Sequence, residues 1–184
     1  IITKAGEASK TGAEVGTGNY NTLKANAFVG GSGSNMSYIV SGNYAKSNGY
    51  RENSQTDSRD LGVNFNYFQG DNFKLNLSGG YHRDKTGLPG ALKDSDFAAG
   101  RKRTDSVFPN DFAETEDSYV KGSPEIYFGG ESLLRLDLSF RRRDFQSFAS
   151  GDWGNFMGQT KLETADLSPH AALKKTTETW KNSL

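Results

Sequence analysis

The 184-residue sequence has no cysteine, only two histidines and four prolines, and no net charge. Without cysteine, the chain has no disulfide framework, no thiolate metal site and no cysteine nucleophile. A net charge of zero gives no reason to expect a nucleic-acid partner. No apolar run reaches the roughly eighteen residues of a transmembrane helix, which excludes that class of membrane anchor. The segment IITKAGEASK at residues 1–10 also lacks the apolar core of a signal peptide.

Apolar residues are scarce as well. Hydrophobic residues make up 34% of the chain and its mean hydropathy is -0.71, which approaches the composition of disordered proteins. Disorder would also require a high net charge and few aromatic residues, whereas Phe, Tyr and Trp make up 12%. The composition therefore predicts an ordered chain that has little apolar material for a core.

Strict alternation of apolar and polar residues is the main pattern. In FKLNLSGGYH, residues 73–82, the odd-numbered positions are mostly apolar and the even-numbered positions mostly polar. Four more segments alternate in the same way: YNTLKANAFV (20–29), MSYIVSGNY (36–44), LGVNFNYF (61–68) and LLRLDLSFR (133–141). A helix would scatter these apolar residues around its circumference, so the sequence predicts five β-strands with one apolar and one polar face.

Weaker alternation predicts strands at 12–17, 119–128 and 159–173, and the start of another at residue 176. Because proline cannot donate a hydrogen bond to a strand ladder, we expect a bend or bulge at Pro169.

The connections between these strands alternate in length. Short turns are expected at 30–35, 69–72, 129–132 and around 174–175, and long connections at 47–58, 84–118 and 144–155. Short turns at one end and long loops at the other are typical of outer-membrane barrels, whereas a soluble sandwich has no such constraint. The predicted fold class is all-β: an antiparallel up-and-down meander forming part of a transmembrane β-barrel, with about eight strands plus the start of a ninth.

Four segments carry a further pattern: IITKAG (1–6), GTGNYNTLKANAFVGG (16–31), SGNYAKSNGYREN (41–53) and SGGYHRDKTGLPGAL (78–92). Together, in this order and spacing, they resemble the TonB-dependent outer-membrane receptors at the junction between plug and barrel. The resemblance implies that residues 1–10 are the end of the plug domain and a linker, and that residues 11–184 are the N-terminal part of the barrel. A complete receptor has a plug and a barrel of many more strands, so the chain is expected to be a fragment.

The same resemblance implies TonB-dependent active uptake of a bulky nutrient, a ferric siderophore or a cobalamin, through the outer membrane of a Gram-negative bacterium. The implied partners are this ligand, outer-membrane lipid and lipopolysaccharide, and TonB acting through the plug. No cofactor, enzymatic activity or nucleic-acid partner is expected. A passive porin or adhesin-like barrel stays open as an alternative, and so does a barrel hydrolase.

Two groups of residues in the long connections are candidates for ligand binding. Tyr50 and Arg51 begin the first long connection, where they could stack on and pair with a bulky ligand. Arg101, Lys102 and Arg103 lie in the longest connection, where they could attract an anionic ligand. Two plainer interpretations stay open: Tyr50 as part of an aromatic girdle at the lipid interface, and the basic residues as a solvated loop balanced by the acidic run 111–117.

Two further groups are candidates for catalysis or for contact with the membrane surface. His82, Arg83 and Asp84 are consecutive on a predicted strand, so they point to alternating faces and cannot form a catalytic relay among themselves. The run 141–143, three arginines, is expected at the exterior end of a strand, facing lipopolysaccharide or the barrel rim.

Metal binding is not expected. Asp94 and Asp96, or Asp57 and Asp60, offer oxygen ligands for calcium, but their spacing matches no calcium loop.

Overall fold

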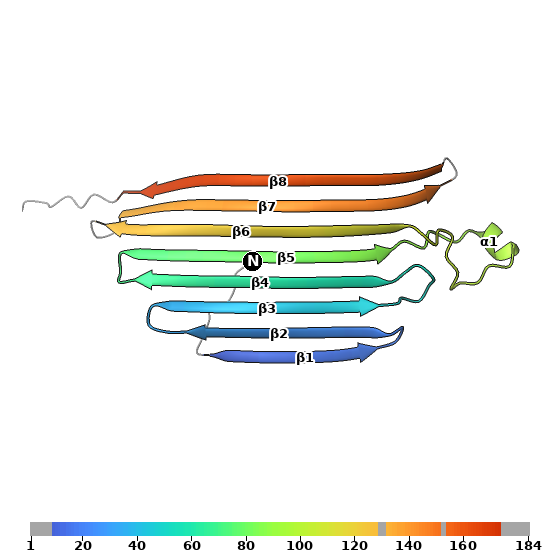
Figure 1. The fold of residues 1–184 in the computed structure, drawn as a ribbon, viewed down its shortest axis with the longest axis horizontal. Coiled ribbons are helices and arrows are strands. Elements are labelled where there is room, and N and C mark those ends of the chain that lie inside the picture. The colour runs from blue at the N-terminus through green and yellow to red at the C-terminus, as the bar shows by residue number, and fades with distance from the viewer. Residues whose placement is uncertain (1–8, 129–131, 152–153, 174–184) are drawn as a thin grey trace, which may run out of the picture.

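The structure, a computed structural model, describes residues 9–128, 132–151 and 154–173. In these ranges eight strands form one sheet in chain order, each antiparallel to the next (Figure 1). The strands are β1 (Lys10–Gly18), β2 (Thr22–Ser32), β3 (Met36–Ser47), β4 (Thr56–Gln69), β5 (Phe73–Gly87), β6 (Phe112–Phe128), β7 (Ser132–Gly151) and β8 (Gly154–Ala172). The predicted all-β up-and-down meander is confirmed. The expected ninth strand from residue 176 lies outside the described residues, as does IITKAG.

One short helix, α1 (Asp94–Ala98), interrupts the longest connection and was not predicted. Among the described residues, no helix is long and apolar enough to cross a membrane.

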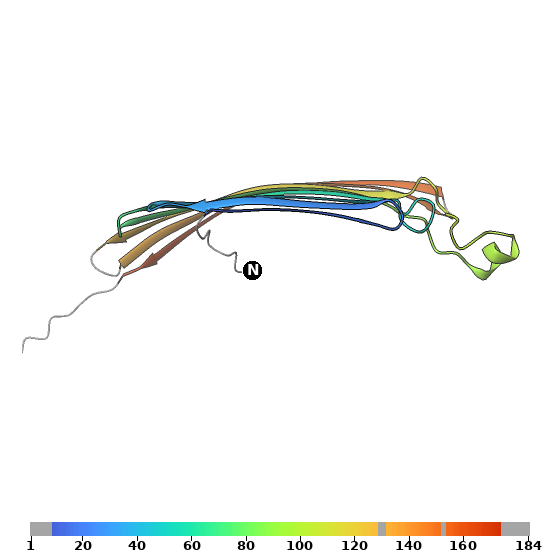
Figure 2. The same ribbon diagram turned by 90° about the horizontal axis from the view of Figure 1, so that it is seen from below.

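The sheet is a single curved layer, seen edge-on in Figure 2. No hydrophobic residue of the described chain is buried, because no second layer of described residues packs on either face. A water-soluble sheet of this size would cover at least one face to form a core. The scarcity of apolar residues in the sequence thus corresponds to a fold without a conventional core.

The strand register aligns the apolar residues into rows on one side, here called the apolar face. One row passes from Val29 to Val40 and Val63, and continues through Val120 to Phe140. Cross-strand neighbours of this kind, β-branched or aromatic, stabilise pairing in a sheet. The alternating positions form the opposite, polar face. The five strongly alternating segments lie in strands with the faces predicted, apart from Tyr20 and Asn21, which lie in the turn before β2.

A belt of charged residues borders the apolar face toward the end that carries the long connections. This charged belt comprises Lys46, Asp57, Arg59, Arg83, Lys85, Glu114, Glu116, Arg142, Asp144, Lys161 and Glu163, which the register places on the same face as the valine row. The border between apolar and charged residues runs obliquely across the strands. On β2 the apolar residues extend as far as Leu23, which pairs with Lys46 of the belt. On β8 the apolar residues end at Ala165, which lies in the same cross-strand row as Val120. Strands that tilt across an apolar band produce such a slant.

The ends of the sheet differ in loop length, but less strictly than expected. Short links 33–35 and 70–72 lie at one end, and the connections 48–55 and 88–111 lie at the other end, which also carries the short link 19–21 (Figure 1). The longest connection is narrower than the predicted 84–118, because pairing continues to Gly87 opposite Phe112.

One expectation about β7 and β8 is wrong, and a second is wrong in part. The long connection at 144–155 is absent, because β7 continues to Gly151 and β8 begins at Gly154. The bulge at Pro169 is also absent: Pro169 pairs with Leu136 in an unbroken register. Pro169 lies on the last strand of the described sheet, where a missing N–H is tolerated on the side away from the neighbouring strand.

Candidate functional site on the polar face and at the long connections

The polar face carries a histidine held between two carboxylates. His82 Nδ1 lies 2.6 Å from Asp60 Oδ1, and His82 Nε2 lies 2.8 Å from Asp84 Oδ1. Asp60 is the direct cross-strand neighbour of His82, and Asp84 is two positions along the same strand, which places all three on one face. The imidazole ring is therefore held by a carboxylate at each of its two nitrogens.

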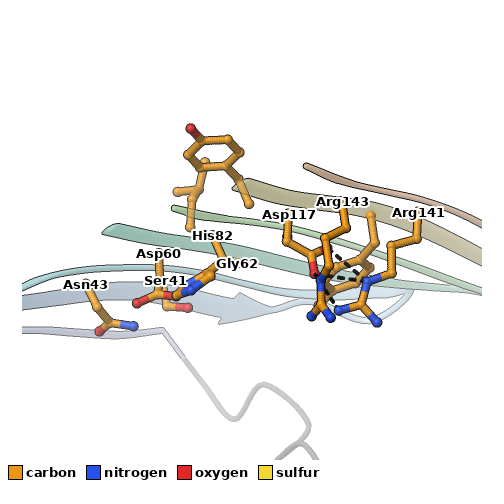
Figure 3. A pocket seen from close by; sticks show the side chains of 12 residues that line it. Ser41, Asn43, Asp60, Gly62, His82, Asp117, Arg141 and Arg143 are labelled. Carbon is orange, nitrogen blue, oxygen red and sulfur yellow. Dashed lines mark hydrogen bonds and ion pairs between the residues drawn. The ribbon is translucent and has the colours of Figure 1, made fainter. Parts of the chain in front are cut away.

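Asp117 is the centre of a second charged group on the same face. Arg141 Nε donates to Asp117 Oδ1 at 2.9 Å, and Arg143 Nε donates to Asp117 Oδ2 at 2.8 Å. Asp117 is only 6% exposed, so the two arginines cover it almost completely. Figure 3 shows both arginines directed at the carboxylate. Charge-assisted hydrogen bonds of this kind are among the strongest polar contacts in proteins.

The two groups line one shallow hollow of about 510 Å³, which also includes Ser41, Asn43 and Tyr119 (Figure 3). Its floor depends on Gly80: a Cβ built there would lie 2.5 Å from Cε1 of the Tyr119 ring. Without a side chain at Gly80, the ring of Tyr119 can approach the strand backbone closely. The hollow is thus a wet, charged depression in a wall of strands.

The sequence-based expectations for these residues are met only in part. Arg83 points to the opposite face, as strand alternation predicted, and there pairs with Glu114 at 2.6 Å. His82 and Asp84 do bond to each other, since alternation places residues two apart on one face. Both ring nitrogens of His82 face carboxylates, so neither is free to accept a proton from a hydroxyl nucleophile.

The expectation for the three arginines is corrected. They do not end a strand, because β7 continues to Gly151. Arg141 and Arg143 lie on the polar face against Asp117, and only Arg142 belongs to the charged belt. Asp117 itself was not singled out by the sequence; its importance depends on cross-strand pairing with Arg143, which a single sequence does not reveal.

At the long-connection end, Arg51 and Asn53 hold the two longest connections together. Arg51 donates to the carbonyl oxygen of Gly90 at 2.6 Å and to that of Asp105 at 2.9 Å. Asn53, whose φ of 54° suits asparagine, donates to the carbonyl oxygens of Phe108 at 2.7 Å and Asp111 at 2.8 Å.

Asp111 extends this contact to β7. Its carboxylate accepts from the hydroxyl of Ser150 at 2.7 Å and from the Ser150 N–H at 2.9 Å, and it is 4% exposed. Arg51, Asn53 and Asp111 are here called the loop clamp. The clamp fixes connection 88–111 against its neighbours, so it is a folded unit and not a free loop.

The five candidate ligand residues lie in or beside this unit. Tyr50 is 53% exposed and contacts Tyr20 edge-to-face, with ring centroids 5.8 Å apart. Arg101 pairs with Asp96 at 3.4 Å and donates to the Ser106 carbonyl. Lys102 and Arg103 follow it in the same connection and are exposed. The guanidinium group of Arg51 donates to backbone carbonyl oxygens of connection 88–111. Ligand binding by these five residues stays a prediction.

No metal site emerges from the candidate acidic pairs. Within residues 9–128, 132–151 and 154–173, no three His, Asp or Glu side chains gather in a way that could hold a metal ion. Asp57 lies on the apolar face and Asp60 on the polar face, so their carboxylates do not converge.

The sequence matches no family model and no curated protein. Among solved structures, the chain is similar to the ferric citrate transporter FecA in its unliganded form, with a TM-score of 0.71 and 16% sequence identity. The match covers 88% of this chain and 24% of that chain, so the chain spans about a quarter of the transporter's length. The fold of this sheet is therefore that of a segment of the transporter's structure.

Proposed function

We propose that the chain forms part of the wall of an outer-membrane β-barrel transporter of the TonB-dependent receptor type, which takes up a bulky nutrient. The apolar face would contact lipid, and the polar face would line the lumen and meet a plug domain. The wall segment would begin near residue 11, with residues 1–10 as the end of the plug and a linker.

One observation carries this proposal: an eight-stranded meander with an uncovered apolar face and a hydrogen-bonded polar face. Exposing the apolar face to water would cost free energy, whereas the hydrocarbon of a membrane would solvate it. The polar face suits an aqueous lumen. Tyr44 and Tyr81 lie at the border with the charged belt, and Tyr67 lies toward the short-turn end, as expected for aromatic residues at membrane interfaces.

The nutrient would bind at the long-connection end. Tyr50 and the exposed basic residues Arg101, Lys102 and Arg103 would contact it, with Arg51 supporting the connection that carries them. The similarity to a ferric citrate transporter supports an iron complex as one ligand class, and a cobalamin remains the other.

The test uses the full-length protein that contains this chain, expressed in a Gram-negative host. We expect it in the outer-membrane fraction, with uptake of radiolabelled ferric siderophore or cyanocobalamin that stops when TonB is deleted. Uptake that continues without TonB, together with a steady open conductance in planar bilayers, would identify a passive porin instead. A protein found only in soluble fractions would overturn the barrel assignment.

A further inference from the structure

The charged belt is divided into a basic and an acidic half. On β3, β4 and β5 it carries four cations, Lys46, Arg59, Arg83 and Lys85, against the single carboxylate of Asp57. On β6, β7 and β8 the carboxylates of Glu114, Glu116, Asp144 and Glu163 outnumber the cations of Arg142 and Lys161. The basic half therefore has charge available for an anion from outside the chain.

The four cations are close together. The register places Arg59 beside Arg83, and Lys46 and Lys85 on either side of Asp57 in the next row. With strands about 4.8 Å apart and alternate residues about 7 Å apart along a strand, they fall within roughly 10 Å by 7 Å. That is an area a phosphorylated headgroup can cover.

Internal ion pairs do not use up these side chains. Arg59 pairs with Asp57 at 3.0 Å and Arg83 with Glu114 at 2.6 Å, but 59% and 47% of the two arginine side chains remain exposed. Lys85 pairs with Glu114 at 3.4 Å and is 52% exposed. Lys46 is exposed and has no ion pair among the described residues. Arginine keeps further N–H donors in a fixed fork, which suits phosphate oxygens.

The position of the basic half identifies its occupant. It borders Tyr44, Leu61 and Tyr81 on the apolar face, at the level where apolar side chains give way to charged ones. In a membrane this is the depth of the headgroups, and a molecule bound there can place phosphate on the cations and acyl chains on the apolar rows below.

We propose that Lys46, Arg59, Arg83 and Lys85 form a binding site for the phosphate groups of an anionic lipid of the outer leaflet. This inference rests on the proposed outer-membrane location and adds a specific lipid site on its β3–β5 wall. The acidic half of the belt on β6–β8 is excluded from the site by its charge.

The test measures lipid binding to the full-length protein in a neutral detergent. The probe is diphosphoryl lipid A, compared with phosphatidylcholine and with inorganic pyrophosphate as competitor. We expect lipid A to bind, and the double variant Lys46→Gln/Arg83→Gln to raise its Kd about tenfold through loss of charge-assisted contacts. The matched variant Arg142→Gln/Lys161→Gln removes the same charge from the acidic half and should change Kd less than about twofold.

Each other outcome overturns the site. Equal loss of binding in both double variants would show a general charge effect, and equal binding of phosphatidylcholine would show no phosphate selectivity. Full competition by pyrophosphate at the lipid's concentration would assign the cations to a free anion. Lys46→Gln alone, which breaks no ion pair, should still raise Kd about threefold if the double variant fails to fold. A protein that sorts to the outer membrane but fails these tests refutes the lipid site only, and one absent from that membrane also refutes the proposed function.

Discussion

At the scale of single residues, Asp117 organises the charges of the polar face. Its carboxylate is nearly buried and accepts hydrogen bonds from the guanidinium groups of both Arg141 and Arg143. We expect Asp117→Asn to lower the free energy of unfolding by about 1–2 kcal/mol, because two cations lose their shared partner while remaining partly solvated. Denaturant unfolding of the full-length protein in detergent measures this. Asp166→Asn, which changes a solvated contact to Ser139, is the matched control, and an equal loss there would contradict the argument.

Gly80 has a steric role beneath Tyr119. We expect Gly80→Ala to destabilise the protein by about 1–3 kcal/mol, because the new methyl group would overlap the ring. Gly42→Ala is the control, since its Cβ would meet nothing closer than the Asp60 carbonyl oxygen at 3.7 Å. Thermal unfolding of both variants compares them, and similar midpoints would contradict this role.

Glu114 gives a pH dependence in the charged belt, outside the apolar rows. Its hydrogen bond from Arg83 lowers the pKa of Glu114 below the ordinary 4.5. A carboxyl group whose pKa is lowered on folding stabilises the protein fully above its ordinary pKa of 4.5. This stabilisation is lost as the pH falls through the lowered pKa of the folded state. Glu114→Gln should therefore be less stable than the parent protein at pH 7, and this difference should shrink as the pH falls below 4.5 toward pH 2. A stability difference that is constant between these two pH values would contradict the assignment.

At the scale of elements, the loop clamp makes connection 88–111 depend on connection 48–55. We expect Arg51→Gln to speed limited proteolysis within 88–111 about tenfold, because the open state gains population when the contacts to Gly90 and Asp105 are lost. Arg103→Gln is the matched control, because it removes the same charge from an arginine that has no ion pair among the described residues. Equal cleavage of both variants would show that charge, and not the clamp, protects the connection.

The strands also show how far alternation predicts elements. Alternation located the five main strands because each of them has apolar side chains on one face of the sheet and polar side chains on the other. It failed beyond residue 144, where Phe145 and Phe148 lie on opposite faces and neither face is consistently apolar, although pairing with β8 continues. Alternation of apolar and polar residues therefore marks only the part of a strand whose two faces differ in polarity. It does not show how far the hydrogen-bonded pairing continues.

The candidate site was less predictable than the strands. Alternation was sufficient to place His82 and Asp84 on one face. The contacts of Asp60, Asp117 and Asp111 join segments distant in sequence, so they depend on strand register and loop packing that no local pattern encodes.

At the scale of the whole molecule, the uncovered apolar face is the feature by which the proposed membrane wall would differ from a soluble sheet. We expect Val63→Lys to make the free energy of folding of the full-length protein into lipid bilayers less favourable by about 2–4 kcal/mol. This is the cost of a cation that faces hydrocarbon in the middle of the bilayer. Asn64→Lys places the same charge on the polar face and should cost less than about 1 kcal/mol. Heat-modifiable gel mobility after folding into vesicles reports both. A larger loss for Asn64→Lys would reverse the assignment of the two faces.

The pairing on the polar face also determines the electrostatic potential above it. Two carboxylates flank His82, and two guanidinium groups flank Asp117. The first group therefore has an excess of negative charge and the second an excess of positive charge, and both line the same hollow. Two opposite charges side by side form a dipole, whose potential decays faster with distance than that of a single charge and is screened within roughly a Debye length. A solute moving along this wall would pass a negative and then a positive patch, and would be attracted or repelled only close to the surface.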